Sequence, residues 1–432
     1  MKTRHVAPPR ATPLSSASVW RDRAFVLFWL AQTVSGTGTS VTNVVLPILV
    51  FQRTGSPLQT AILGGLRVVP YLLFGLVAGA LADHTNRRRL MVGCNLLNTA
   101  LLGSIPVAAW LGVLSLPQIY LVALLSATAF VLFDAANFGA LPALVGPARI
   151  VAANSALWST STFVGIAGPA LGGVLATTIG PAPAVTLDAL SYAVSAATLL
   201  LIARPFNATR AIATESGSLM RRTLDDIQEG LRFLWGQPVI RILTGLGFGA
   251  SFTSGAVYGL LVVYGVRALG LTAHDGRLGL LFATSALGAL LPSLALPRLA
   301  RRYQPGTITL IALALDLLFL VGLALAPTFG LGLVALLLWD TSYTLVVING
   351  IALRQRVTPE RLQSRVNATA RMIAWGGTPF GAALGGALAQ VATVRVAYLT
   401  MAGVVAATLA AGLLSPLRER RGGPTPPQDT VT

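Results

Sequence analysis

The sequence predicts an all-α integral membrane protein with twelve transmembrane helices arranged as two six-helix repeats. Of its 432 residues, 54% are hydrophobic and only 10% are charged, which is far from the composition of soluble domains. Apolar runs of about twenty residues, the length that a helix needs to cross a bilayer, recur from end to end. The nonapeptide GPALGGVLA at 168–176 returns as GAALGGALA at 381–389, and the same spacing carries Arg88 and Arg89 onto Arg301 and Arg302. The chain is therefore interpreted as a tandem duplication.

Each predicted span is one continuous apolar run. The strands of a membrane barrel would instead alternate apolar and polar residues over shorter stretches, so a β-barrel is excluded. Six runs fall in each repeat, and their approximate limits in chain order are 25–50, 58–82, 90–111, 119–140, 156–179, 184–202, 238–266, 279–296, 307–325, 329–352, 372–391 and 396–414.

Arginine sets the predicted orientation of these spans. With a cytoplasmic N-terminus, 26 of the 31 lysines and arginines lie in cytoplasmic segments, and Arg53, Arg267, Arg277 and Arg395 lie outside, with Arg67 inside span two. The positive-inside rule therefore places both termini in the cytoplasm. The predicted organisation is a cytoplasmic segment 1–24, a six-helix bundle 25–203, a cytoplasmic linker 204–237, a second six-helix bundle 238–415 and a disordered tail 416–432.

The linker 204–237 predicts an amphipathic helix on the cytoplasmic face. Its apolar residues are Leu224, Ile227, Leu231, Leu234 and Trp235, against Asp225, Asp226, Glu229 and Arg232. We interpret it as a helix that joins the repeats; a regulatory or partner-binding role is the alternative.

Composition also excludes several classes of function. The net charge of +17 is spread over alternate loops, whereas a nucleic-acid-binding surface would gather it on one face, so no nucleic-acid partner is expected. A single cysteine, Cys94, excludes a disulfide framework and a cysteine metal site. The histidines His5, His84 and His274 fall outside the spans, and no nucleophile–base pair or metal-ligand cluster appears within them. We therefore expect no catalytic site, no metal and no enzyme activity.

The connection after span two reads GALADHTNRRR at 79–89. It resembles the signature of the major facilitator superfamily, Gly-x-Leu-Ala-Asp-Arg-x-Gly-Arg-Arg. Gly79, Asp83, Arg87 and Arg88 match the signature, and the resemblance implies a cytoplasmic gate in which a carboxylate beside arginines holds one half against the other and releases it. Asn86 stands where the family has glycine, and we expect it to take the left-handed turn in its place.

A second motif lies in span five. Gly168, Pro169, Gly172 and Gly173 resemble the motif of the antiporting, exporting branches of the superfamily. Glycines four residues apart let two helices approach closely, and proline removes a backbone donor. The copy that begins at Gly381 lacks the proline, so ordinary close packing is the alternative. The resemblance implies export rather than uptake.

Several further stretches resemble one branch, the enterobactin-exporter and macrolide-efflux-like transporters. They are Thr54–Ser56, Ala153–Ser155, Leu187–Tyr192, Glu229–Trp235 and Thr358–Leu362. The chain departs from the branch at Thr39, where many members carry an acidic residue, and at Ser364, where members usually have glycine.

In this superfamily, spans one, four, seven and ten line the substrate cavity. The candidate lining residues on these spans are Gln32, Thr39, Asn43, Phe133, Asn137, Phe252, Tyr258, Tyr264, Trp339, Tyr343 and Asn349. Aromatic walls with few polar groups suit an apolar or amphipathic small molecule better than a sugar. Packing within the bundle is the alternative for each aromatic residue.

Ionisable residues inside a bilayer are costly and are therefore candidates for function. Asp134 and Asp340 lie on cavity-lining spans, and Arg67 is expected to pair with Asp134. We expect Asp134 to bind the coupling proton, and Asp340 to share that role or to attract a cationic substrate. Asp188 is expected near the outer end of its span as an interfacial or capping residue. Asp316 has no assigned role.

The sequence therefore predicts a secondary active transporter, a proton-coupled antiporter that exports a hydrophobic or amphipathic drug, macrolide, siderophore or metabolite by alternating access. The proton is the coupling ion, and no other cofactor is expected. We expect a monomer in the cytoplasmic membrane of a bacterium, with a small-molecule substrate and the lipid bilayer as its partners. An importer or uniporter on the same fold and a non-transporting membrane sensor are the alternatives.

Overall fold

The computed structural model describes residues 19–207, 219–359 and 362–415, except for some side chains within helices, that of Asp83 among them. All regular structure in these ranges is helical. The first half contains α1 Arg23–Thr54, α2 Pro57–Leu66, α3 Val69–His84, α4 Arg87–Trp110, α5 Leu116–Val145, α6 Ile150–Thr178 and α7 Pro181–Leu200. The linker helix is α8 Leu219–Gly236, and the second half contains α9 Pro238–Gly259, α10 Leu261–Arg267, α11 Leu278–Arg302, α12 Pro305–Leu325, α13 Phe329–Val357, α14 Gln363–Trp375, α15 Gly377–Val391 and α16 Val394–Leu413.

Three of the predicted spans are broken within their apolar runs. Span two is divided into α2 and α3, and span eleven into α14 and α15. In both, a proline lies four residues after the last helical residue, Pro70 after Leu66 and Pro379 after Trp375. Proline cannot donate the hydrogen bond that would continue the helix, so the helix ends there. Span seven bends by 51° between α9 and α10.

These breaks affect the number of spans. In the described part of the chain, ten helices are long and apolar enough to cross a membrane, and α9 with α10 would be an eleventh. The predicted run 372–391 is not among them, because the break at Gly376 leaves α15 with 15 residues. The all-α membrane fold is confirmed, while the count of twelve and the cytoplasmic termini stay predictions.

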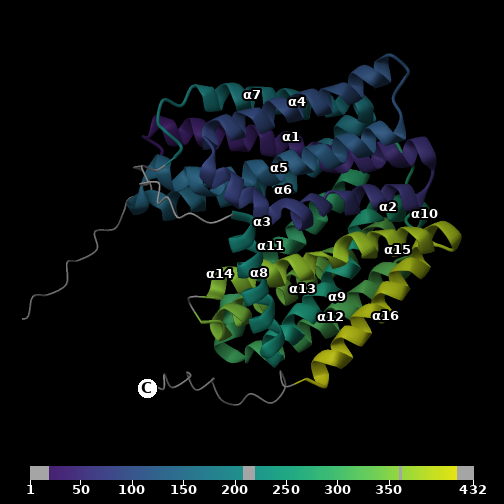
Figure 1. The fold of residues 1–432 in the computed structure, drawn as a ribbon. Coiled ribbons are helices and arrows are strands. Elements are labelled where there is room, and N and C mark those ends of the chain that lie inside the picture. The colour runs from purple at the N-terminus through teal and green to yellow at the C-terminus, as the bar shows by residue number, and fades with distance from the viewer. Residues whose placement is uncertain (1–18, 208–218, 360–361, 416–432) are drawn as a thin grey trace, which may run out of the picture.

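The duplication read from the sequence is visible in the packing. Figure 1 shows α1 to α7 in one bundle and α9 to α16 in a second bundle beside it. In the first, α6 packs against α1 and against α11 of the other bundle; in the second, α15 packs against α9 and against α2 of the first. We call the end of the bundles where α7 leads into the linker the linker end, and the opposite end the distal end.

The turn between α3 and α4 differs from the expected one. Asn86 has an extended backbone, with φ −71° and ψ 105°, and its side chain accepts a hydrogen bond from the Arg89 amide as the N-cap of α4. The expected left-handed turn is wrong, because an asparagine oxygen that satisfies a free N–H at the helix start favours this extended geometry.

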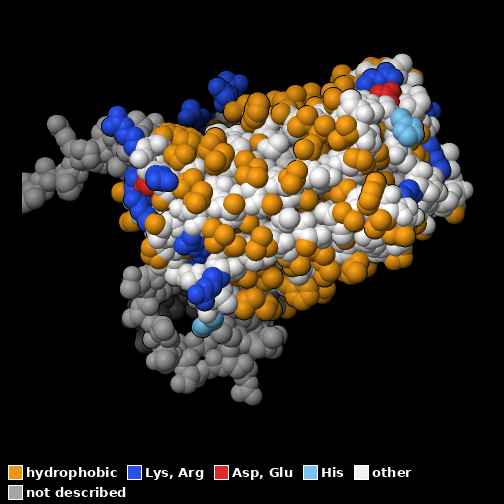
Figure 2. Space-filling view, turned by 90° about the horizontal axis from the view of Figure 1, so that it is seen from above, with side chains coloured by type: hydrophobic (Ala, Val, Ile, Leu, Met, Phe, Trp, Pro, Cys, Tyr) orange, Lys and Arg blue, Asp and Glu red, His pale blue; other side chains and the backbone are white. Residues whose placement is uncertain are grey.

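The lateral surface is suited to hydrocarbon. Figure 2 shows hydrophobic side chains along the length of the molecule and arginines toward its two ends. Large apolar side chains such as Leu294 and Leu318 are 61% and 60% exposed. Exposure of this kind over a whole molecule is unfavourable in water and favourable in a bilayer.

Candidate functional site

The glycine motif of α6 lies where the two halves meet. Gly168 and Gly172 leave no room for a Cβ against α1, and Gly173 leaves none against Gly279 at the start of α11. The carbonyl of Pro169 faces Gly279 across the same contact. The motif therefore allows α6 to pack closely on its own half and on the other half at once.

The second copy of the motif repeats this arrangement. Gly381 of α15 lies against the backbone of Phe252 in α9, and Gly386 lies against the backbone of Leu58 in α2. Both copies thus join a helix to the first helix of its own half and to the opposite half. Close packing accounts for the glycines in both places.

Polar contacts add to the join at the distal end. Arg267 of α10 donates a hydrogen bond of 2.7 Å to the carbonyl of Gly55, which ends α1, and lies 5.9 Å from the centre of the Phe51 ring. Ser56 Oγ donates to Gln390 Oε1 at 2.9 Å. Since each contact joins the first half to the second, the distal end is closed in this conformation.

Asp134 binds a tyrosine. Tyr71 Oη of α3 donates to Asp134 Oδ2 of α5 at 2.5 Å. On the other side of the phenol ring, Arg371 of α14 lies 5.7 Å from its centre, and Trp375 lies edge-on at 5.4 Å. Arg371 also lies 5.3 Å from the Trp375 ring. Because α3 and α14 belong to different halves, these contacts connect Asp134 to the second half.

The sequence predicts that Arg67 pairs with Asp134, but in the structure it does not. Its guanidinium donates to Asn43 Oδ1 of α1 and interacts electrostatically with Asp188 and Tyr192 of α7. The ion pairs of Asp22 and Asp275 lie at helix ends, and no ion pair among the described residues includes Arg67. The prediction is wrong because the break between α2 and α3 brings Arg67 to α1 and α7, whereas the Asp134 carboxylate is turned to α3.

Asp188 is also not where it was expected. It is the eighth residue of α7, its exposed fraction is 1%, and the N-cap of the helix is Gly180. Asp188 is therefore an interior acid and neither an interfacial nor a capping residue.

The polar residues of α1 that are predicted to line the cavity form hydrogen bonds to other helices of the first half. Gln32 Nε2 donates to Asn137 Oδ1 of α5 at 2.5 Å, and Thr39 Oγ1 lies 2.9 Å from Tyr192 Oη of α7. With the contact between Arg67 and Asn43, the structure brings these candidates together on the inner side of the first half.

The second half holds a buried carboxylate among hydroxyl groups. Asp340 of α13 has an exposed fraction of 0%. Tyr258 Oη donates to both of its oxygens at 3.1 and 3.0 Å, Ser285 Oγ of α11 donates to Oδ2, and Thr344 Oγ1 lies 3.3 Å from Oδ1. All the hydrogen-bond donors to this acid are hydroxyls, and among the described residues no arginine forms an ion pair with it.

Aromatic rings enclose the same carboxylate. Trp339 stacks on Tyr343 with ring centres 5.6 Å apart, and Tyr258 meets the Trp339 ring edge-on at 5.7 Å. Tyr258 remains 36% exposed although Trp339 is fully buried. Tyr258 is thus the accessible edge of an aromatic cluster that covers Asp340.

Four predicted lining residues are packing residues in this conformation. Phe133 belongs to a hydrophobic cluster within the first half, and Trp339 to one that includes residues of both halves. Tyr264 is fully buried, and its hydroxyl donates to a carbonyl of α12 at 2.7 Å. Asn349 donates to Thr309 of α12 at 2.8 Å and is 3% exposed. Their placement as lining residues is therefore wrong here; Phe252 and Tyr343 are partly exposed.

The motif after α3 is only partly described. Arg87 Nη1 donates to the carbonyl of Gly139 in α5 at 2.9 Å, and Arg88 donates to a carbonyl of α7. Both contacts stay within the first half, and a Cβ at Gly79 would meet nothing within 4 Å. The Asp83 side chain lies outside the described residues, so the gate across the halves stays a prediction.

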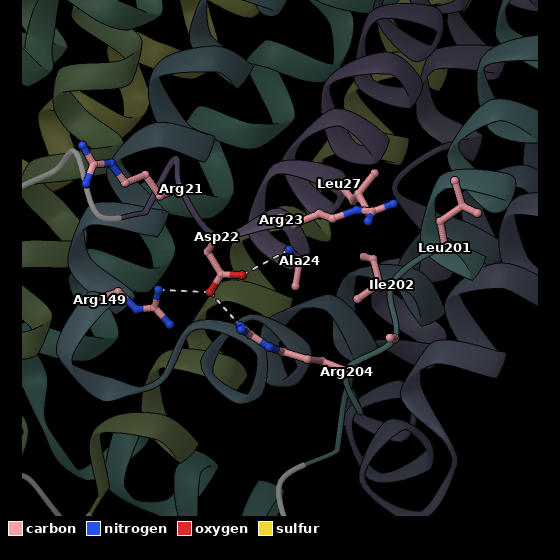
Figure 3. A pocket seen from close by; sticks show the side chains of 10 residues that line it. Arg21, Asp22, Arg23, Ala24, Leu27, Arg149, Leu201, Ile202 and Arg204 are labelled. Carbon is pink, nitrogen blue, oxygen red and sulfur yellow. Dashed lines mark hydrogen bonds and ion pairs between the residues drawn. The ribbon is translucent and has the colours of Figure 1, made fainter.

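A carboxylate that the sequence did not single out organises the linker end. Asp22 caps α1 through the Ala24 amide at 3.1 Å and accepts from Arg149 Nη1 at 3.0 Å and Arg204 Nη1 at 2.6 Å (Figure 3). Burial acts to raise the pKa of Asp22, but the hydrogen bond and charge of Arg204, the amide and Arg149 outweigh it and hold the pKa below its usual value. These groups border a cavity of about 540 Å³ that also exposes Arg21.

Several residues of the site escaped the sequence reasoning. Tyr71, Trp375 and Ser285 lie on spans that are not expected to line a cavity, and Arg371 falls in the predicted cytoplasmic segment before span eleven. Arg371 and Trp375 are four residues apart and share a helix face, a spacing that was available in the sequence. Nothing in the sequence indicated that Tyr71 faces them across the halves.

Comparison with known proteins gives one family. A family model described as transmembrane secretion effector matches residues 14–429. The multidrug efflux pump Tap of Mycolicibacterium fortuitum is 28% identical over 386 residues, which are 87% of this chain and 91% of that protein. The enterobactin exporter EntS of Citrobacter koseri is 28% identical over 415 residues, which are 94% of this chain and 95% of that protein.

Solved structures share the fold at low identity. The nucleoside transporter NupG superposes with a TM-score of 0.71 at 14% identity, covering 90% of this chain and 97% of that one. A bacterial homologue of the human lysosomal transporter Spinster, inward-facing and unoccupied, gives a TM-score of 0.72 at 13% identity, covering 91% of this chain and 96% of that one.

Proposed function

The chain belongs to the transmembrane secretion effector family of major facilitator transporters, and from this premise we propose that it is an efflux transporter that exports a hydrophobic or amphipathic small molecule in exchange for protons. It works as a monomer in the cytoplasmic membrane of a bacterium, by alternating access between the bundles. A drug, a macrolide, a siderophore or a metabolite of the cell fits this class of substrate.

Two observations support export of such a molecule. The relatives that align over most of the chain are named as a multidrug efflux pump and as an exporter. Exposed side chains near the contacts between the halves include the aromatic rings of Tyr258 and Trp375 and the cation of Arg371. Aromatic surfaces with few hydrogen-bonding groups bind apolar molecules better than polyols.

The observation that carries proton coupling is how the acids within the spans are bonded. Asp134 is held by the hydroxyl of Tyr71, and Asp340 by those of Tyr258, Ser285 and a threonine. An acid held by hydroxyls can take up a proton without leaving a buried arginine unpaired. We assign the coupling proton to Asp134 and Asp340, and to Arg67 the role of the cation that responds to the charge of the first half.

The motif after α3 supplies the gate in this proposal. Asp83, Gly79, Arg87 and Arg88 lie at the linker end, opposite the closed distal end. A latch there would form when the linker end closes and the distal end opens. The test is to cross-link the linker ends of α3 and α14 with and without substrate. A latch requires that the yield of cross-linked protein differs between the two conditions.

The test of function uses efflux-deficient bacterial cells. Accumulation of ethidium and of a macrolide is compared between cells with the wild-type protein, with Asp134→Asn, with Asp340→Asn and with Asp275→Asn. The last removes a partly exposed acid that is ion-paired to Arg277 outside the spans and serves as the control. Export predicts lower accumulation with the wild type and the control, and loss of the effect with a protonophore and with the two other variants.

The outcomes separate the alternatives. Higher accumulation than in empty cells would indicate import, and accumulation that ignores the protonophore would indicate a uniporter or another coupling ion. Equal accumulation of every compound, without substrate-dependent proton flux, would favour a non-transporting sensor.

A further inference from the structure

Asp188 lies in the interior of the first half. It is about 10 Å along α7 from Pro181 at 1.5 Å per residue. A Cβ added at Gly38 of α1 would collide with the Asp188 carboxylate and with Ser191 Oγ. Glycine at this position therefore lets α1 approach the carboxylate without covering it with an apolar side chain.

Hydroxyl groups surround this carboxylate. Ser191 Oγ lies 3.2 Å from Asp188 Oδ1, and Thr39 and Thr42 of α1 lie beside it. The Thr42 side chain is buried next to this carboxylate. A hydroxyl can donate to a carboxylate or accept from a carboxylic acid, so both protonation states of Asp188 can be satisfied here.

Arg67 is the cation that acts on this group. The other titratable groups near Asp188 are the Tyr192 phenol on α7 and, beyond it, the Cys94 thiol on α4. Unlike Asp188, Arg67 has an exposed side chain, and its hydrogen bond is to Asn43, one helical turn from Thr39. A buried acid therefore interacts electrostatically with an accessible arginine that forms no ion pair with it among the described residues.

We propose that Asp188 and Arg67 form a proton-binding site of the first half, in addition to the acids assigned above. In the charged state the carboxylate attracts the guanidinium. When a proton from water between the halves forms an O–H bond on Asp188, the negative charge disappears and Arg67 is released toward the substrate path. The proton leaves the same oxygen to water on the other side, and no other bond forms or breaks.

This inference rests on the proposed proton-driven export and names a residue pair that drives it. A neutral residue at 188 should separate binding from coupling. We expect purified Asp188→Asn in liposomes to lose ethidium transport driven by a pH gradient, while exchange of ethidium across the membrane without a gradient continues. Asp188→Glu should restore gradient-driven transport in part, and Asp275→Asn should behave as the wild type.

A second measurement does not depend on transport. Ethidium is added to purified protein in weakly buffered detergent, and proton release is followed with a pH indicator. We expect Asp188→Asn to release about one proton fewer than the wild type, and Arg67→Gln to move the pH at which release occurs.

The results of these two experiments either support or overturn the proposal. Gradient-driven transport at the wild-type rate in Asp188→Asn overturns the proposal, as does loss of exchange in both Asp188→Asn and Asp188→Glu, which would show a structural role. If transport by the wild-type protein does not depend on the pH gradient, the proposed function is contradicted. If proton release is also the same in Asp188→Asn as in the wild type, the proton-binding site is overturned as well.

Discussion

The Tyr71 hydroxyl donates a hydrogen bond of 2.5 Å to Asp134, and the face of its ring is turned to the Arg371 guanidinium of the other half. One side chain thereby connects a carboxylate of the first bundle to a helix of the second. A hydrogen bond to a carboxylate contributes about 1.5–3 kcal/mol and a cation–π contact about 0.5–2 kcal/mol. Free energies of this size are large enough that a change of charge on Asp134, which would weaken the hydrogen bond, alters the balance between conformations.

The two functions of Tyr71 can be separated by substitution. We expect Tyr71→Phe to slow transport because Asp134 loses its donor, while the ring still holds Arg371. Tyr71→Ala should in addition loosen the contact between α3 and α14. The measurement is ethidium transport together with maleimide labelling of a cysteine at Met372 of α14, which leaves Arg371 and Trp375 in place, after Cys94→Ser. Equal labelling in the two variants would contradict the role of the ring.

Arg267 is expected to hold the distal end closed. It reaches Gly55 of the first half, whereas Arg395 donates to Ala268 and Ala326 within the second half only. Loss of a charged hydrogen bond worth about 1.5–3 kcal/mol shifts a two-state balance by about ten- to a hundredfold. Arg267→Gln should therefore raise the fraction with an open distal end, and Arg395→Gln should not.

The measurement for this prediction is labelling of a cysteine at Leu58, which lies against Gly386 across the halves. A membrane-impermeant maleimide is added outside intact cells carrying Cys94→Ser. Faster labelling in Arg267→Gln than in Arg395→Gln is expected, and the same rate in both would show that the glycine contacts alone close this end.

Close packing makes a prediction about stability. A Cβ at Gly381 would collide with the backbone of Phe252, whereas one at Gly403 of α16 would meet nothing within 4 Å. We expect Gly381→Ala to lower the free energy of unfolding by about 1–3 kcal/mol, the usual cost of overpacking. Gly403→Ala should raise it by up to about 1 kcal/mol, since alanine favours a helix. Melting temperatures in detergent compare them, and a stable Gly381→Ala would refute the close contact.

The sequence was sufficient for the fold because the information there is repetitive. Long apolar runs define the membrane helices, and the returning nonapeptide around Gly168 and Gly381 shows the duplication. The motif residues predicted close packing, which the structure bears out. The breaks before Pro70 and Pro379 were visible as prolines, but an apolar run continues through both, so hydropathy alone does not divide the span.

The site was less predictable because its contacts are between helices distant in sequence. The sequence pairs Arg67 with Asp134 because Arg67 is the evident cation within a span, yet a local helix break brings Arg67 to Asn43 of α1 instead. Tyr264 and Asn349 were placed in the cavity from helix number alone, whereas their hydrogen bonds to α12 depend on the rotation of each helix. Rotation about the helix axis is set by tertiary packing, which an apolar run without a polar face does not specify.

The charge cluster at the linker end predicts a pH-dependent contribution to stability. The pKa of Asp22 is lowered in the folded protein. Its contribution is therefore complete above the unfolded pKa of about 3.9 and is lost as the pH falls through the folded pKa. Asparagine caps a helix as well as aspartate does, so Asp22→Asn removes only the charge. At pH 7 it should lower the melting temperature by the equivalent of about 0.2–1 kcal/mol, the usual value of a partly exposed ion pair. Below the folded pKa this difference should shrink, because protonation discharges the wild-type carboxyl too.

Arg204→Gln should follow the same course, and Arg21→Gln, whose side chain points away from Asp22 in Figure 3, should not. A difference between Asp22→Asn and the wild type that is as large in acid as at pH 7 would mean that the charge on Asp22 does not contribute to holding α1 to the linker.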